Sequence, residues 1–593
     1  MRNQKYILLT FLLGLFLMAS CSDNFLETEP LDEFADGAVW GDESLSEAFI
    51  NNIYQRLDQT FTQGRLKAMI VDEAHYRGNT ASLQFNRSQL TADGIPSWGN
   101  NQSFSSWNDL YKSVRFANMF LENADRIPAE DQVLNRMKGE ALFLRAYLYH
   151  LLMRQYGGVP LVSRVFELVD DFNIPRSSLE ETVNFIVADL DQAVALLPDS
   201  YTGNDIGRAT KGAALALKSR VLVRAASDLY NTPIFSSYSN PELIAYVGGN
   251  RAARWQAAKD AAKAVMDLGQ YGLFKADPAP GDDVSENFVQ LFISKNNEED
   301  IFLRYFTLRD NVQIGLVTGP NGWHNWGTNA PVGDLVDDYA MADGSRFDWS
   351  NPAHAAKPYE NREPRFYATI LYEGAKWRPR PEYLRAEEPE GVIQVGKWEI
   401  WDNATNSIQI KNGLDTRQSP IENWNGSYTG YYSRKFIDPQ YDHQYIRQDV
   451  PYRFIRYTEI VLNYVEACIE LGEYEEARFH LNSIRKRAGL PAVTESGDAL
   501  RDLYRLERRI ELALEDHRIW DVRRWAIGPD AYDKSVTRAE VVYKLLPDRT
   551  TDSIPTITHV PLESHEWIDK AYFFPILRDE LNRNELLIQN PGY

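Results

Sequence analysis

A helical period runs through most of the chain and stops over one central stretch, which limits the fold to a helical scaffold with a large irregular insertion. Ser178 and Glu181 form a capping-box pattern that opens one helix, and Pro198 ends it. Apolar residues recur between them at helical spacing: Leu179, Val183, Ile186, Val187, Leu190, Val194 and Leu197. A chain of 593 residues exceeds the roughly 250 to 300 that one hydrophobic core usually serves, unless it stacks repeated units. We therefore expect a mainly α fold.

The predicted helices come in pairs. Residues 456–471 and 474–487 form one pair, joined by the tight turn Gly472-Glu473, and the positions of Gly472, Tyr474 and Ala477 are similar to those of a tetratricopeptide repeat. Hairpins of similar length recur at 107–156 and 179–229. We therefore predict degenerate helical repeats over about 40–270 and 450–530. From about 274 to 449 the period disappears, and a segment of that kind is usually functional.

The first twenty residues are predicted to be a signal peptide. Arg2 and Lys5 precede a twelve-residue apolar stretch, Ile7 to Met18, which is shorter than the roughly 20 residues of a spanning helix. Small residues then run into Cys21, as in the lipobox of bacterial lipoproteins, so Cys21 is the expected lipidation site. The alternative is an ordinary cleavage site with an incidental cysteine. The mature chain, 21–593, is expected to be a single soluble domain held to a membrane by lipid.

Composition argues against several classes of partner and cofactor. The formal charge is −21, from 63 basic and 84 acidic side chains, and no basic run is longer than Arg485-Lys486-Arg487. Nucleic-acid binding needs clustered Lys and Arg, so we expect no such partner. The two cysteines form no CxxC pair, and the histidines are scattered. We expect no cofactor; the many carboxylates would allow a structural calcium ion, but no EF-hand spacing marks a site.

Tryptophan is concentrated in the irregular stretch. Seven of the fourteen lie between residues 323 and 424. An indole offers a flat apolar face and one donor, which suits the C–H faces and hydroxyl rims of sugar rings. Two glycine-flanked loops are candidate stacking platforms: Gly322 to Gly327, which carries Trp323 and Trp326, and Ile95 to Asn101, which carries Trp98 and Asn101. The alternative for each indole is burial beneath a loop.

Sequence motifs for catalysis are missing. The chain has no H-E-x-x-H, P-loop, G-x-G-x-x-G or G-x-S-x-G pattern. The acids and arginines from Glu507 to Arg518 recur at i, i+3 and i+4, which is typical of a salt-bridged helix face. A surface glycoside hydrolase stays an alternative, because its two carboxylates lie far apart in sequence. The sequence therefore favours a binding protein over an enzyme.

Several segments resemble the SusD/RagB family of Bacteroidetes outer-membrane lipoproteins. The resemblance rests on Gly139-Glu140-Ala-Leu-Phe-Leu-Arg145-Ala146-Tyr147 with Tyr156-Gly157-Gly158-Val159-Pro160, on Asn361-Arg-Glu-Pro-Arg365-Phe366, and on Glu507-Arg508-Arg509 with Arg518 and Asp521. Further matches include Arg208 to Gly212, Thr429 to Tyr432, Arg453 to Pro491 and the end of the chain from Leu581 to Tyr593. They follow the family's order over nearly the whole mature chain.

The resemblance implies a SusD-like fold that acts without chemistry. Members of the family sit on the cell exterior, lipid-anchored in the outer membrane, as a lid on a SusC-like TonB-dependent transporter, and capture oligosaccharides for import. Members that resemble RagB take up peptides, which is the alternative here. Family ligand sites draw aromatic side chains from the loop before the helix at Trp107 and from the irregular middle. We expect the ligand to contact Trp98, Asn101, Trp323 and Trp326.

Overall fold

The computed structural model describes residues 36–57, 60–76, 80–96 and 107–593. Helix accounts for 44% of the chain and strand for 10%, which confirms the prediction of a mainly α, SusD-like fold. The predicted signal peptide (1–20) and the lipidation site Cys21 lie outside the described residues. In the described part, no helix is both long and apolar enough to cross a membrane.

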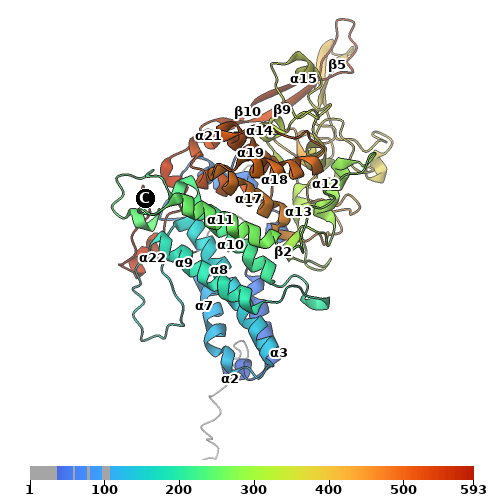
Figure 1. Cartoon of the computed structure of the whole chain (residues 1–593). Helices are drawn as coiled ribbons and strands as arrows, with labels where there is room; N and C mark the ends of the chain where they lie inside the picture. Colours follow the sequence, from blue (N-terminus) through green and yellow to red (C-terminus); the bar gives the residue numbers. More distant parts are fainter. Residues whose placement is uncertain (1–35, 58–59, 77–79, 97–106) are drawn as a thin grey trace, which may run out of the picture.

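Helices pack side by side in one continuous stack, in which each helix contacts the next (Figure 1). The order is α7 (Trp107–Asn123), α8 (Asp131–Tyr156), α9 (Leu179–Leu196), α10 (Lys211–Ala226), α11 (Arg251–Met266), α17 (Tyr457–Glu470) and α18 (Tyr474–Arg487). Two more helices, α3 (Glu43–Gln55) and α19 (Gly497–Glu511), flank it. The step from α11 to α17 joins segments that are far apart in sequence. The predicted helical hairpins are therefore parts of one scaffold.

Local sequence signals explain where these helices begin and how closely they pack. Helix α9 begins with a complete capping box, in which the Ser178 side chain accepts a bond from the Glu181 N–H and the Glu181 side chain accepts one from the Ser178 N–H. Helix α10 contacts α9, α11 and α17. Its Gly212 leaves room for the Tyr271 hydroxyl, which would lie 2.2 Å from an added Cβ. Small side chains on α10 therefore permit close packing against its neighbours.

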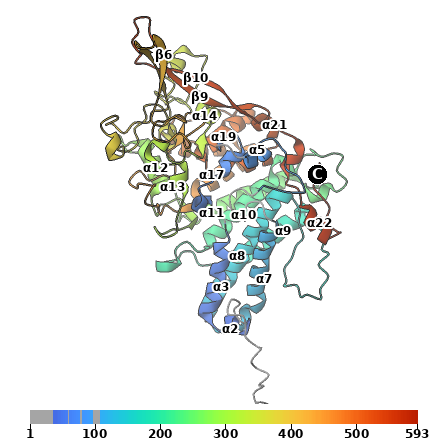
Figure 2. The same ribbon diagram turned by 180° about the vertical axis from the view of Figure 1, so that it is seen from behind.

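The irregular segment leaves the stack after α11 and returns to it at α17. Its two ends are held together, because β2 (Asp300–Arg304) pairs antiparallel with β8 (Tyr452–Arg456). Its helices are short: α12 (Val284–Ile293), α13 (Ile314–Thr318), α14 (Gly333–Asp338), α15 (Pro352–Ala356) and α16 (Pro364–Thr369). Figures 1 and 2 show this segment on one side of the molecule, beyond the end of the helical stack.

A four-stranded sheet, which the sequence analysis does not predict, joins the irregular segment to the carboxyl-terminal part of the chain. Its order is β10 (Thr556–Ser564), β9 (Ser535–Tyr543), β5 (Lys397–Asp402) and β6 (Ser407–Asn412). Strands β5 and β9 run parallel, and the Trp398 and Tyr543 rings stack at 4.5 Å. The remaining strands are short pairs: β1 (Ala74–His75) with β3 (Ala330–Pro331), and β4 (Ile370–Leu371) with β7 (Tyr432–Ser433).

Candidate functional site

The structure separates the two indoles that the sequence places in one surface platform. Trp323 is 2% exposed, so its expected exposure is wrong. Its ring lies 3.7 Å from the Arg380 guanidinium carbon, and its Nε1 donates to the Pro379 carbonyl at 3.1 Å. Trp326 is 40% exposed. Trp323 packs against Arg380 and in a hydrophobic cluster with Leu371, Ile393 and Tyr432, whereas Trp326 is open to a ligand.

The other two predicted ligand residues, Trp98 and Asn101, lie outside the described residues. Ligand contact by Trp98, Asn101 and Trp326 therefore stays a prediction.

The loop that carries Trp326 contacts the loop that carries Trp424, and the contact depends on a glycine. Gly327 has φ +60°, and a Cβ there would lie 2.7 Å from the Gly426 carbonyl carbon. Asn321 ties the same loops together: its amide donates to the carbonyls of Thr416 at 2.9 Å and Glu422 at 3.0 Å. The loop of Trp326 and the loop of Trp424 are thus fixed against each other, which preorganises the surface between them.

Aromatic side chains collect around this loop contact. We call them the aromatic face; they are Trp326 (40% exposed), Tyr383 (64%), Trp424 (63%) and Tyr445 (80%). Monomeric proteins seldom leave several large aromatic rings open to water without a use. Of the seven tryptophans of the irregular segment, only Trp326 and Trp424 are strongly exposed. Most tryptophans of the irregular segment are therefore buried or half-buried and contribute little to a binding surface.

His324 connects two parts of the aromatic face. It adopts a left-handed backbone conformation (φ 59°), with its Nδ1 2.9 Å from a Glu422 carboxylate oxygen and its Nε2 2.6 Å from the Tyr383 hydroxyl. Partial burial raises the pKa of Tyr383, and the nearby Glu422 and Tyr445 add to the shift. Tyr383 therefore lies close to both residues. The face thus joins flat rings to hydrogen-bonding groups. Tyr383 and Tyr445 were not predicted as site residues, because nothing near them in sequence marks them.

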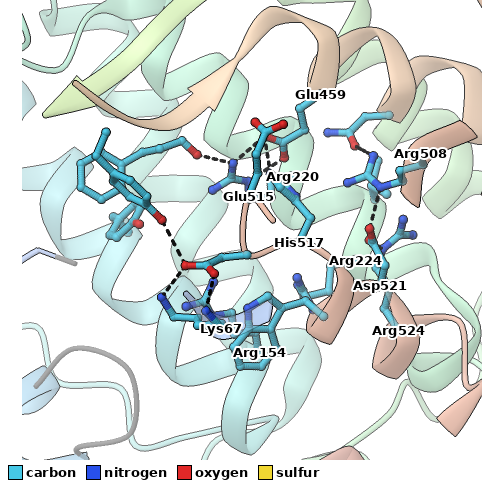
Figure 3. A pocket seen from close by; sticks show the side chains of 17 residues that line it. Lys67, Arg154, Arg220, Arg224, Glu459, Arg508, Glu515, His517, Asp521 and Arg524 are labelled. Carbon is cyan, nitrogen blue, oxygen red and sulfur yellow. Dashed lines mark hydrogen bonds and ion pairs between the residues drawn. The ribbon is translucent and has the colours of Figure 1, made fainter. Parts of the chain in front are cut away.

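A second cluster of charged side chains lines an internal cavity of about 50 Å³, room for only a few water molecules (Figure 3). Each carboxylate there has a basic partner: Glu459 pairs with Arg220, Glu515 with Arg456, Asp516 with Lys67, and Asp521 with Arg508 and Arg524. Burial lowers the pKa of His517 to about 4. With its acids paired and little space, this cavity suits a structural role.

The arginines and acids from Glu507 to Arg518 form ion pairs, but mostly with other elements and not along one helix as the sequence predicts. Glu507 of α19 pairs with Arg365 and Arg485, and Arg509 pairs with Asp72. These side chains are buried. Among the residues that the structure describes, no group of three or more His, Cys, Asp or Glu is placed to hold a metal ion.

The helical stack and the loop-built aromatic face define the class: a mainly α scaffold that presents an irregular, aromatic surface. A family model described as the SusD family matches residues 288–593, and a second, described as starch-binding and associating with the outer membrane, matches residues 24–223. The chain belongs to the SusD family.

Individual relatives agree with this assignment. A SusD-like protein of Bacteroides fragilis of known structure is 30% identical, with a TM-score of 0.72 over 95% of this chain and 100% of that one. A SusD-like carbohydrate-binding protein of the same species is 22% identical, with a TM-score of 0.68 over 93% of this chain and 100% of that one. At this identity the comparison shows a shared fold. A SusD-like protein of Bacteroides ovatus is 29% identical over 35% of this chain, and the match spans 37% of that protein's length.

Proposed function

We propose that this chain is a non-catalytic glycan-binding protein, and that the aromatic face is its ligand site. The observation that carries the proposal is the exposure of Trp326, Tyr383, Trp424 and Tyr445 on loops of the irregular segment. Similar proteins support it: one matching family model is described as starch-binding, and one similar structure as carbohydrate-binding.

The chemistry of the aromatic face suits a sugar chain. Trp and Tyr rings stack on the apolar C–H faces of sugar rings, while groups at their edges bond to hydroxyls. Here the edges carry the His324 imidazole and the Glu422 carboxylate, 2.9 Å apart. Trp98 and Asn101 are further proposed contacts. Trp323 has a different proposed role, which is to hold Arg380 beneath the loops that carry the face.

We further propose that the protein delivers its ligand to a SusC-like TonB-dependent transporter. The leader pattern that ends at Cys21 supports a lipid anchor, and the description of one matching family as associating with the outer membrane supports that location. The lipid would hold the chain at the outer membrane, facing the exterior. The helical stack offers an extended surface of the kind that repeat proteins use for partners.

Native affinity electrophoresis tests glycan binding most simply. The mature chain from Ser22 to Tyr593 would be run through gels that contain different polysaccharides, beside a ligand-free gel. A Trp326→Ala, Trp424→Ala double variant removes two rings of the face. Phe479→Ala is a matched control, since Phe479 is 71% exposed but lies on α18.

Retardation by one glycan class, lost in the double variant and kept in Phe479→Ala, is the expected result. Binding of peptides with no retardation by any glycan would favour the peptide-capturing alternative. Release of reducing sugar from a polysaccharide by the purified protein would favour a glycoside hydrolase and overturn the non-catalytic part of the proposal.

A further inference from the structure

A charged pocket opens next to the aromatic face. It has a volume of about 280 Å³ and lies between the start of β5, the loop at 415–418, the turn at 427–430 and strand β9. The charged side chains that line it are Lys397, Asp415, Arg417, Arg538 and Glu540. We call it the basic pocket, because its basic side chains outnumber its acidic ones.

Both carboxylates of the basic pocket are already paired. Asp415 is fully buried, and its two oxygens accept bonds from Arg380 at 3.0 and 2.7 Å. Glu540 accepts a bond from Arg538 at 2.7 Å. Each of the two acids thus has a basic partner other than Lys397 and Arg417.

The other two cations, Lys397 and Arg417, have no carboxylate partner among the described residues, and both are half-buried. Arg417 lies 4.5 Å above the ring centre of Tyr428, and one of its nitrogens donates to the carbonyls of Trp424 at 2.6 Å and Asn425 at 3.2 Å. A guanidinium has five donors in a planar fork, so most of the fork of Arg417 remains for a ligand.

Lys397 and Arg417 place unbalanced positive charge in a pocket of an acidic chain. Its net charge is −21, and acids outnumber bases. Fully buried cations have fixed partners: Lys435 pairs with Glu515 at 2.9 Å, and Arg362 donates to the carbonyls of Pro358, Val336 and Tyr339. A half-buried cation without a counter-charge loses hydration and gains no ion pair, unless a bound anion supplies one. The pocket is therefore prepared for an anion.

The position of Arg417 ties this anion to the glycan site. Arg417 bonds to the backbone of Trp424, an exposed ring of the aromatic face. We propose that the ligand is an anionic glycan, whose rings stack on the aromatic face while its acidic groups bind Lys397 and Arg417. The inference rests on the proposed glycan-binding function and adds the class of ligand. A uronate carboxylate and a sulfate ester share the required chemistry, because both accept paired bonds from a guanidinium.

The test compares glycans that differ only in charge. One arm sets polygalacturonate against its carboxyl-reduced form, and a second sets dextran sulfate against dextran, so that carboxylate and sulfate are distinguished. A third arm is a broad panel of neutral and acidic polysaccharides. Binding by the mature chain is measured by affinity electrophoresis and by titration calorimetry.

Three variants test whether Lys397 and Arg417 bind the acidic groups of the glycan. Lys397→Gln removes a side chain that makes no hydrogen bond or ion pair among the described residues, so the fold should be unaffected. Arg417→Lys keeps a cation in the pocket and loses the fork. Lys411→Gln is the matched control, because Lys411 lies on the neighbouring strand β6 with its side chain 59% exposed.

We expect binding of acidic glycans only, weakened at least about tenfold by Lys397→Gln and by Arg417→Lys and unchanged by Lys411→Gln. Raising sodium chloride from about 0.05 to about 0.5 M should weaken it further. Equal binding of the neutral partners, or acidic binding that both pocket variants leave unchanged, would overturn the inference and leave the glycan-binding proposal standing. Binding of no glycan in any arm would overturn both.

Discussion

Arg365 of α16 and Glu507 of α19 form a buried ion pair, with 2.5 Å between guanidinium nitrogen and carboxylate oxygen. Both side chains are at most 3% exposed. The same guanidinium also pairs with Glu363 and Glu511. One side chain from the irregular segment thus neutralises acids from the helical body, which fixes the segment that carries the aromatic face to the scaffold.

Removal of that guanidinium should destabilise the whole protein. Arg365→Met leaves three buried acids short of a partner, and we expect a loss of about 3 to 5 kcal/mol in the free energy of unfolding. Urea denaturation followed by circular dichroism measures it. Arg583→Met is the control, because Arg583 is 65% exposed and its pair with Glu580 should contribute less than about 1 kcal/mol. Equal losses in the two variants would contradict the proposed link.

Replacement of Trp323 should mainly lower stability, whereas replacement of Trp326 should mainly weaken ligand binding. Trp323→Ala leaves a cavity beneath Arg380 and should lower the free energy of unfolding by about 3 to 5 kcal/mol. Trp326→Ala removes a ring that is 40% exposed, and we expect a loss below about 1 kcal/mol together with weaker glycan binding. Thermal melts and affinity gels measure the two effects. A Trp326→Ala protein that binds as well as the wild type would remove Trp326 from the site.

The contact between the loops of Trp326 and Trp424 should depend on the missing side chain of Gly327. In Gly327→Ala the new Cβ meets the Gly426 backbone, so the loops must separate and glycan affinity should fall by about tenfold or more. Gly374→Ala is the control. Gly374 also has a positive φ, +82°, but no atom lies within 4 Å of the new Cβ, so it costs only backbone strain. Unchanged affinity in Gly327→Ala would show that the loop contact does not shape the site.

Buried Glu73 should make stability depend on pH. Burial, together with the neighbouring Asp72 charge, raises the pKa of Glu73 to about 8 from about 4.5, although Arg509 opposes the shift. Between these values the folded protein holds a proton that the unfolded chain has lost. This contribution is complete below about pH 4.5 and disappears as the pH rises through about 8.

The neutral variant Glu73→Gln should not lose stability in that window. We expect the wild type to lose free energy of unfolding relative to Glu73→Gln as the pH rises from about 5 to about 8. Urea titrations at several pH values measure the difference. Glu475→Gln, at a side chain 94% exposed, should run parallel to the wild type. A constant difference between wild type and Glu73→Gln would show that Glu73 titrates normally.

The helical scaffold was largely predictable from sequence, because its signals are local. The capping box at Ser178 and Glu181 and the turn at Gly472 set helix ends that the structure reproduces at α9, α17 and α18. Strands β9 and β10 were missed. The two strands pair with each other, but the side chains of β10 are mostly half-exposed, without a clear alternation, and the further partner of β9, strand β5, lies far away in sequence.

The site was predictable only in part, since exposure in long loops depends on partners distant in sequence. Trp323 and Trp326 share one motif, yet the first packs against Arg380 and is 2% exposed, whereas the second is 40% exposed. Tyr383 and Tyr445 enter the aromatic face from separate loops. Arg417 has no carboxylate partner among the described residues although Asp415 lies two residues away in sequence, because Asp415 pairs with Arg380, which sequence does not reveal.

A crystal structure of the mature chain with a glycan that it retains in affinity gels tests the central claim most directly. We predict sugar rings stacked on Trp326 and Trp424, with hydroxyls within hydrogen-bond distance of His324 or Tyr383. Glycan bound elsewhere on the protein, with the aromatic face left open to solvent, would contradict the account.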